Sequence, residues 1–517
     1  MKGGHMLKSR TQKAALNTIT AALSEIIMLV CGLILPRLIL SHYGSAYNGI
    51  TQSAKQFLSA ISILNVGIAG TTRVALYKSL AANDKEKTSG LVRATALHMR
   101  KVGLVLSVYV IALMILYPLL VDTGYGWFEV APLIFAASLS SFGRYFFGTA
   151  YRALLTADQC IYIANIFSII SNILNTIINV ILIYAGCSIQ VVRVAAAVVL
   201  LLNPILMSIY VRKRYKLDTH CEPDKSALAL RKDVMAHSVA NIIHDHTDMV
   251  VLTIFTNVKI VSVYTVYNLV MNALKKTQSV FTSGTEAVFG NMWAKGEHEK
   301  IKTNLGYYEL IVGCFASVVF STTLVMILQF IKLYTKGVHD VEYILPAYAM
   351  VITIAQALAC IRAPYITLVQ GAGHYKQTKK GAYFEAGINI SLSVLLVQFI
   401  GIVGVAIGTL VANTFRTLQY AIYIDNNLVK RGKSVFIKKT IWTAINIGII
   451  YFTSQTIISR IPCTTWITWI ITAFLVTVFS IIVTFISACI FYKHDLIETK
   501  DIISRVLKKR RKKADKR

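Results

Sequence analysis

Long apolar runs alternate with short polar links along the whole chain. A helix needs about 20 predominantly apolar residues to cross the hydrocarbon core of a bilayer. By this criterion the pattern predicts about fourteen membrane-spanning helices. The first run, 14–40, is longer than the apolar core of a cleaved signal peptide, so we expect it to be the first span. The predicted fold class is therefore an all-α polytopic membrane protein.

Composition agrees with this class and adds an orientation. The chain has 517 residues, of which 55% are hydrophobic and 15% are charged, whereas soluble proteins carry about 25% charged residues. The net charge of +29 comes from basic residues on alternate links, as in 85–101, 212–232, 430–439 and the tail "KKRRKKADKR". The intervening links, such as "SHYGSA" and "DTGYGW", have almost none. The positive-inside rule therefore predicts that both termini are cytoplasmic. We interpret the basic tail as an anchor beside anionic lipid and expect no nucleic-acid partner.

The sequence repeats itself with an offset of about 214 positions. "GTTRVALYKSLAANDKEK" begins at Gly70 and "GTEAVFGNMWAKGEHEK" at Gly284, while "ALLTADQCIYIANI" and "TLVQGAGHYKQTKK" begin at Ala153 and Thr367. A unit of six spans returns the chain to its starting side, so the two copies share one orientation. We expect two six-helix lobes around a central cleft, followed by two further helices. The predicted domains are 1–13 (N-terminus), 14–212 (first lobe), 213–233 (inter-lobe loop), 234–424 (second lobe), 425–440 (basic loop), 441–492 (last two helices) and 493–517 (basic tail).

A polar stripe interrupts the predicted seventh span, in the stretch "NIIHDHTDMVVL" from 241 to 252. Asn241, His244 and Asp248 are spaced to share one helix face, and Asp245 lies beside that row. Three interpretations are open. The polar groups form packing contacts with neighbouring helices, His244 and Asp248 contribute to a metal site, or the stripe binds a coupling ion. We find no third metal ligand and predict no metal. Ionisable residues inside a membrane are functional by default, so we favour coupling of H⁺ or Na⁺ by His244, Asp245 and Asp248, with no other cofactor.

Cations also lie deep in predicted spans, at Lys55, Lys275 and Arg416, and Arg37 lies near the outer end of the first span. Cations bind phosphate, and amides, hydroxyls and aromatic faces suit sugars. The predicted substrate-binding residues are Lys55, Lys275, Arg416, Arg37, Asn48, Gln52, Tyr264 and Asn268. The external links are too short for a catalytic domain, and the chain has no GxxxxGK[ST] phosphate loop. We therefore expect a transporter of an anionic, polyhydroxylated cargo rather than an enzyme. The eight cysteines form no CxxC pair and are assigned to neither a metal nor a disulfide.

The stretches "LYKSLAANDKEK", "HDHTDMVVL" and "VSVYTVYN" resemble the polysaccharide-biosynthesis flippases. These are Wzx-like transporters of the multidrug/oligosaccharidyl-lipid/polysaccharide exporter superfamily. The resemblance implies alternating access by two lobes around a cationic cavity. It also implies that undecaprenyl-pyrophosphate-linked oligosaccharide moves from the inner to the outer leaflet of a bacterial cytoplasmic membrane. It places Thr247 and Asp248 at the family's polar position in the seventh span. Implied partners are the lipid-linked oligosaccharide, membrane lipid, a polysaccharide polymerase and glycosyltransferases.

Other functions remain open at this stage. A multidrug exporter driven by Na⁺ or H⁺ belongs to the same superfamily, but a site for cationic drugs should be rich in carboxylates and poor in cations. A lipid II flippase is harder to separate from the favoured function by sequence. A membrane glycosyltransferase would need acidic residues in a surface loop, and here the predicted cytoplasmic loops are basic. A scaffold role would leave the charges inside the spans unexplained.

Overall fold

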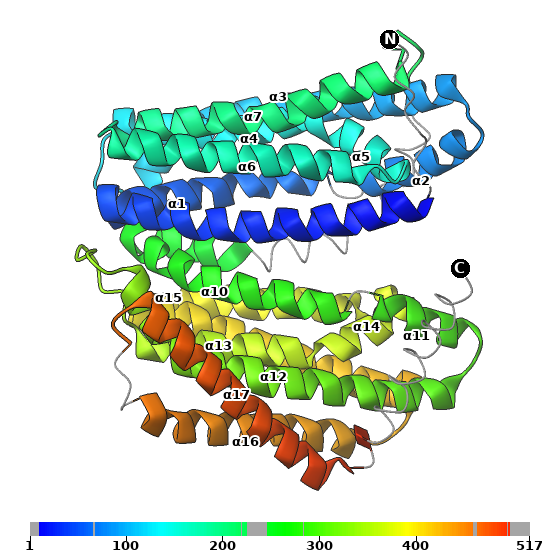
Figure 1. Ribbon diagram of the computed structural model, residues 1–517, viewed down its shortest axis with the longest axis vertical. Coiled ribbons are helices and arrows are strands. Elements are labelled where there is room, and N and C mark those ends of the chain that lie inside the picture. Colours follow the sequence, from blue (N-terminus) through cyan, green and yellow to red (C-terminus); the bar gives the residue numbers. More distant parts are fainter. Residues whose placement is uncertain are drawn as a thin grey trace. The chain divides into compact units, whose positions relative to one another are not determined.

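The computed structural model describes residues 10–65, 68–218, 220–224, 246–282, 284–458, 463–493 and 495–496. All regular structure in this part of the chain is helical (Figure 1). Ten of the helices in it are long and apolar enough to cross a membrane. The predicted all-α polytopic fold is confirmed. Two of the ten candidates, Thr11–Ile63 and Tyr375–Val429, have 53 and 55 residues, and each holds two of the predicted spans.

The described chain divides into two compact units. Unit 1 comprises Met1–Thr265 and Gly337–Val341, and unit 2 comprises Val266–Lys336 and Glu342–Arg517. The domain limits predicted from the repeat stay a prediction.

The helices of unit 1 follow one another with short links and pack side by side (Figure 1). They are α1 (Arg10–Ala60), η1 (Ile61–Asn65), α2 (Ile68–Ala81), α3 (Lys85–Leu120), α4 (Trp127–Gly143), η2 (Arg144–Gly148), α5 (Thr149–Ala157), α6 (Ile161–Tyr184) and α7 (Ile189–Tyr215). The short helix His246–Phe255 and the first residues of α10 (Val258–Thr282) also belong to this unit. The segment η1 is a 3₁₀ turn, and η2 is a single π turn that continues α4 into α5.

A glycine divides α1 into two helices. Gly44 has φ +84° and ψ 177°, which an L side chain rarely adopts. The carboxylate of Asp340 fixes this kink, because it accepts hydrogen bonds from Ser45 N at 2.8 Å and Ser45 Oγ at 2.6 Å. A side chain at Gly44 would also approach Asp340 Oδ2 to 3.1 Å. The chain therefore passes from the first span to the second without a loop.

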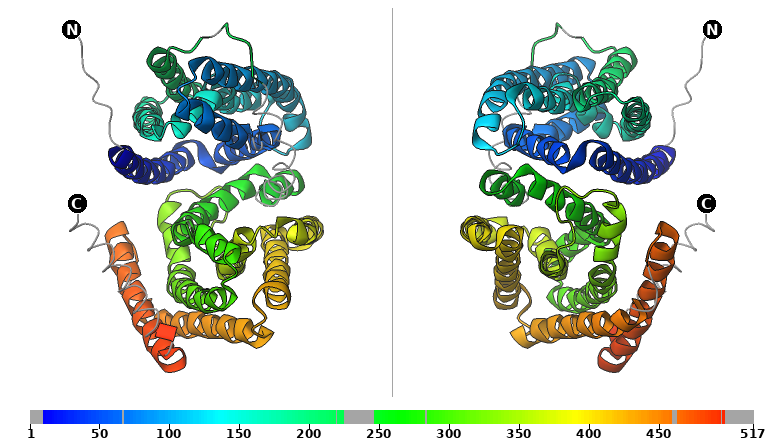
Figure 2. Two further views of the ribbon diagram at one scale, coloured as in Figure 1. Left: turned by 90° about the vertical axis from the view of Figure 1, so that its right-hand side faces the viewer. Right: turned by 90° about the vertical axis from the view of Figure 1, so that its left-hand side faces the viewer.

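Unit 2 contains the remaining described helices. They are the rest of α10, α11 (Thr285–Ala294), α12 (His298–Tyr334), α13 (Pro346–Ile361), α14 (Ala363–Gly371), α15 (Tyr375–Ile424), η3 (Asp425–Val429), α16 (Lys433–Ile458) and α17 (Trp466–Phe491). The long α15 is broken at Ile400 and Gly401, where the glycine has φ +56°. The last two helices, α16 and α17, pack against α12 at the margin of this unit (Figure 2).

Helix boundaries recur along the chain with a constant offset. The helices α5 and α14 end at Ala157 and Gly371, and α6 and α15 begin at Ile161 and Tyr375, in each case 214 positions apart. This equals the offset of the sequence repeat. The break at Gly401 thus takes the place of the α6–α7 link.

Large apolar side chains cover the outside of the helices as well as the interior, and small polar side chains are buried between the helices. Leu119, Phe399 and Phe452 are about three-quarters exposed, whereas Asn179 and Thr353 are fully buried. Many buried hydroxyls bond to their own helix, as when Thr353 Oγ1 donates to the carbonyl of Ala349 at 2.7 Å. Such back-bonding satisfies a polar group where water is absent. This arrangement is the one that a lipid environment requires.

Candidate substrate-binding cavity

Unit 1 encloses a cavity of about 950 Å³ between α1, α2, the continuous α4–η2–α5 helix and α7. Four cationic side chains line it, those of Lys55, Arg73, Arg144 and Arg152. None of its described lining residues is acidic. The remaining polar lining consists of hydroxyls and an amide, from Ser140, Thr149, Thr156 and Asn203. The volume lies at the upper end of the range for small-molecule sites.

A single helix supplies half of the cationic groups. Ser140, Arg144, Gly148, Arg152 and Thr156 all line the cavity and are spaced four residues apart. In a regular α-helix each such step drifts by about 40°, so five positions would not stay on one wall. The π turn of η2 is wider, and in it the Thr149 N–H bonds to the carbonyl of Arg144 five residues earlier. This wider turn offsets the drift and keeps both arginines on the cavity wall.

The four cations have no protein counter-ion in the described structure. Their side chains are exposed to the cavity. None of them makes a hydrogen bond or an ion pair with a residue that the structure describes. A charged group inside a membrane stays ionised only in a water-filled space or beside a partner. The cavity is therefore suited to a hydrated anion that brings its own negative charge.

One of these four residues, Lys55, is among the predicted substrate-binding residues. Arg73, Arg144 and Arg152 were not among the predicted site residues. A signal for two of them is present in "SFGRYFFGTAYRALLT", where polar and small residues recur every fourth position. Arg73 directly follows the Gly-Thr-Thr of the repeat motif.

The deep arginines of unit 2 are in a different state. Arg362 Nη1 donates to Glu385 Oε1 at 2.6 Å, and Arg416 Nε lies 3.3 Å from Glu385 Oε2. Arg416 Nη2 also donates to the hydroxyl of Tyr420 at 2.8 Å. All three charged residues are at most 9% exposed. The predicted site residue Arg416 is thus held in a buried ion-pair network, while Lys55 lines the cavity of unit 1.

The other predicted substrate residues are distributed over two helices. On α1, Asn48 is buried and donates to Ser262 Oγ at 2.8 Å, while Arg37 and Gln52 are partly buried. On α10, Lys275 is exposed and Asn268 is partly buried. Tyr264, on the same helix, is buried. None of these residues is among the described lining of the cavity.

The polar stripe of the predicted seventh span is described only in part. His244 and Asp245 lie outside the described residues. Asp248 is buried in the short helix His246–Phe255. The imidazole of His246 contacts Gln56 Nε2 and lies 3.4 Å from Ser59 Oγ, both on α1. No group of three potential metal ligands occurs among the described residues.

Two clusters of charged and hydroxyl groups connect the ends of neighbouring helices by hydrogen bonds and ion pairs. In unit 1, Asp158 accepts hydrogen bonds from the Tyr215 hydroxyl at 2.6 Å and from Lys13 Nζ at 3.2 Å. Burial acts to raise the pKa of Asp158, but the bonds from Tyr215, Cys160 and Lys13 outweigh it, and the pKa lies below its usual value.

In unit 2 the buried carboxylate of Glu309 is shared by Arg431, Lys439 and the hydroxyl of Tyr365. Burial acts to lower the pKa of Arg431, and the hydrogen bond and charge of Glu309 raise it overall. In both clusters every cation lies beside a carboxylate, in contrast to the cavity.

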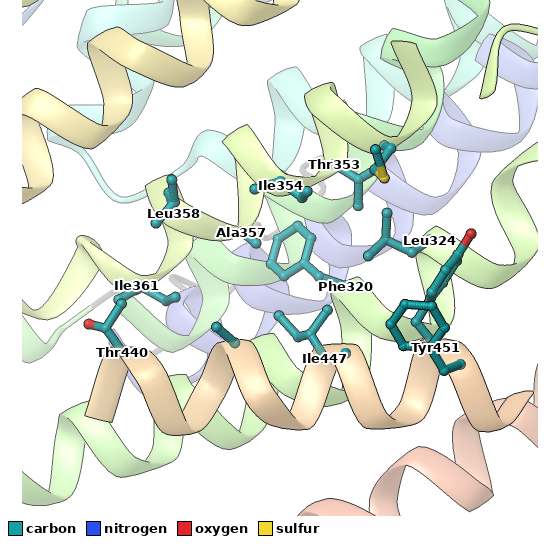
Figure 3. A pocket seen from close by; sticks show the side chains of 14 residues that line it. Phe320, Leu324, Thr353, Ile354, Ala357, Leu358, Ile361, Thr440, Ile447 and Tyr451 are labelled. Atoms are coloured by element: carbon teal, nitrogen blue, oxygen red, sulfur yellow. The ribbon is translucent and has the colours of Figure 1, made fainter. Parts of the chain in front are cut away.

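Unit 2 also holds an apolar pocket of about 320 Å³ between α12, α13 and α16. Phe320, Ile354, Leu358 and Ile447 point into the same space (Figure 3). The only polar atoms among its described lining side chains belong to two threonines and Tyr451, apart from a methionine sulfur. Such a lining suits a hydrocarbon chain rather than a sugar or a phosphate.

Comparison with solved structures identifies the fold. The chain resembles the lipid II flippase MurJ in an inward closed conformation, with a TM-score of 0.68 and 16% identity over 92% of this chain and 99% of that one. It also resembles an inward-facing multidrug resistance MATE family transporter of the MOP superfamily, with a TM-score of 0.59 and 15% identity. That match covers 82% of this chain and 95% of the transporter. No family profile and no curated protein sequence matches the chain. The protein therefore has the fold of the MOP-superfamily transporters.

Proposed function

We propose that the protein is a flippase of the Wzx-like kind. In this proposal it moves an undecaprenyl-pyrophosphate-linked oligosaccharide from the inner to the outer leaflet of a bacterial cytoplasmic membrane, for surface polysaccharide biosynthesis. The observation that carries the proposal is the cavity of unit 1, with four cations and no acidic residue in its described lining. A pyrophosphate supplies the missing anion, and the hydroxyl and amide groups of the wall suit a sugar.

The fold and the apolar pocket support a lipid-linked cargo. MurJ, whose fold the chain shares, is a lipid II flippase. The basic cavity of unit 1 would hold a polar headgroup, and the apolar pocket of unit 2 is, taken by itself, a surface of the kind that suits a hydrocarbon chain. A lipid II flippase is the second candidate, because the same chemistry serves its pyrophosphate.

A multidrug exporter fits the cavity less well. A site for organic cations needs carboxylates or aromatic faces, and the described lining of the cavity contains neither. In the proposed cycle the two lobes alternate access, and His244, Asp245 and Asp248 remain our candidates for binding a coupling H⁺ or Na⁺. Interactions with a polymerase and with glycosyltransferases, and cytoplasmic placement of both termini, belong to the same proposal.

Reconstitution tests the function directly. Purified protein in liposomes is supplied with undecaprenyl-pyrophosphate carrying a fluorescent trisaccharide, and protection from a membrane-impermeant quencher is measured. We expect the wild-type protein and the Lys300→Gln variant, altered at an exposed lysine, to equilibrate the probe between leaflets. Arg152→Gln should do so much more slowly. Absence of movement, together with efflux of a cationic dye by the same vesicles, would support the exporter instead.

A further inference from the structure

The four cavity cations lie at different depths. Arg73 is eight residues before the end of α2 at Ala81, and Arg152 is five residues before the end of α5 at Ala157. At 1.5 Å per residue these positions are about 12 Å and about 8 Å from the helix ends. Arg144 is thirteen residues before Ala157, or about 20 Å. Lys55 precedes Arg73 by 18 residues in the same predicted span, so it lies farther from the end of α2 than Arg73 does. We call Arg73 and Arg152 the shallow pair and Lys55 and Arg144 the deep pair.

The helix ends nearest to the shallow pair lie on the side predicted to be cytoplasmic. The links that follow α2 and α5 are bonded to the neighbouring helix ends of unit 1. Thr88 Oγ1 at the start of α3 donates to Ser79 Oγ near the end of α2 at 3.0 Å. Lys13 near the start of α1 binds Asp158 just after α5. A lipid-linked headgroup that enters from this side reaches the shallow pair first, and its sugars extend toward the deep pair.

A pyrophosphate alone does not match this arrangement. It brings two negative charges close together as a diester, whereas Arg144 and Arg152 are about 12 Å apart along the helix. Two cations suffice to neutralise it, so two positive charges would remain in a cavity whose described lining contains no carboxylate. Cations that stay exposed to the cavity are available to bind a second anionic group.

We infer that the sugar part of the cargo is itself acidic. It carries at least one carboxylate or phosphate substituent, which the deep pair Lys55 and Arg144 binds while the shallow pair Arg73 and Arg152 holds the pyrophosphate. This inference rests on the proposed function and adds the chemical class of its substrate. The deep pair is then the part of the cavity that selects between cargoes.

Two matched probes test the inference. The first is undecaprenyl-pyrophosphate bearing a neutral trisaccharide, and the second is the same compound with one hexose replaced by glucuronic acid. Binding of each to the full-length protein in detergent is measured at low and high salt. We expect the acidic probe to bind about tenfold tighter or more at low salt, because one further charge-assisted contact forms. The difference should shrink at high salt.

Variants then separate the two pairs. The deep-pair variants Lys55→Gln and Arg144→Gln should bind the two probes with equal affinity. The shallow-pair variants Arg73→Gln and Arg152→Gln should bind both probes more weakly, by the same factor, and still prefer the acidic one. Thermal unfolding of each variant verifies that it is folded. Equal affinity for the two probes, or a preference that survives in both deep-pair variants, would overturn the inference while leaving the flippase proposal in place. Failure of the wild-type protein to bind either probe would overturn the proposed function itself, and the inference with it.

Discussion

Arg362 and Glu385 form a buried ion pair across 23 residues of sequence, with 2.6 Å between Nη1 and Oε1. The same carboxylate lies 3.3 Å from Arg416 Nε. One acid therefore compensates two guanidinium groups inside unit 2. The arginines of the unit 1 cavity have no such partner among the described residues, and this difference separates charges that hold the fold together from charges available to a ligand.

Glu385→Gln should destabilise the protein strongly. Removal of the shared carboxylate leaves two buried guanidinium groups without compensation, a change that costs about 3–5 kcal/mol for a broken buried pair. Thermal unfolding of the detergent-solubilised protein measures the loss. Glu297→Gln is the control, because its partner Lys300 is exposed and surface pairs contribute little. Equal unfolding temperatures for the two variants would contradict the structural role of Glu385.

Arg152→Gln should impair substrate binding, whereas Arg416→Gln should impair the stability of the fold. Arg152 has no described partner, so its loss leaves the unfolding temperature nearly unchanged. It should nevertheless weaken binding of undecaprenyl-pyrophosphate about 10- to 100-fold, the range for a lost charge-assisted hydrogen bond. Arg416 belongs to the buried network, so its variant should lose stability first. A destabilised Arg152→Gln protein with unchanged binding would assign Arg152 to the fold instead.

Substitution by alanine at two glycines of α15 should change the stability of the protein in opposite directions. A Cβ at Gly404 would lie 2.4 Å from the carbonyl oxygen of Leu396, a backbone atom that cannot move away. We expect Gly404→Ala to lower the free energy of unfolding by about 1–3 kcal/mol. At Gly387 no atom lies within 4 Å of an added Cβ, and Gly387→Ala should stabilise the helix by up to about 1 kcal/mol. Unfolding temperatures of the two variants test the pair, and similar values would contradict the close helix contact at Gly404.

The Asp158 cluster should make stability depend on acid pH. The pKa of Asp158 is lower in the folded protein than its usual value, so its contribution is present above about pH 4. That contribution is lost as the pH falls toward the folded-state pKa. The difference in unfolding temperature between the wild type and Asp158→Asn should therefore be largest near neutral pH and shrink at about pH 3–4. A difference that grows on acidification would contradict the assignment.

Hydropathy predicted the all-α fold because every helix that crosses the lipid core must be predominantly apolar over about 20 residues. It did not predict which spans are joined without a loop. The expected link "SHYGSA" is helical on both sides of Gly44, since a single left-handed glycine and its contact with Asp340 make the turn. Such a contact spans 295 residues and leaves no local pattern in the sequence.

The candidate site was predictable only in part. Lys55 stands out because it is an isolated lysine in an apolar span. Arg416 looks the same in sequence, and only its distance to Glu385, 31 positions away, shows that it is paired. Arg144 and Arg152 were not predicted, because a regular helical period does not place them on one face together with Thr156.

Because of the π turn of η2, the set of side chains that line the cavity depends on the number of residues in this turn as well as on their identity. A residue deleted between 144 and 148 would let the span close into an ordinary α-helix. The two halves of that span would then rotate by about 100° relative to each other. Arg152 and Thr156 would leave the wall that Arg144 occupies, although neither had been replaced. A chain without the extra residue would therefore have a different binding surface despite identical arginines.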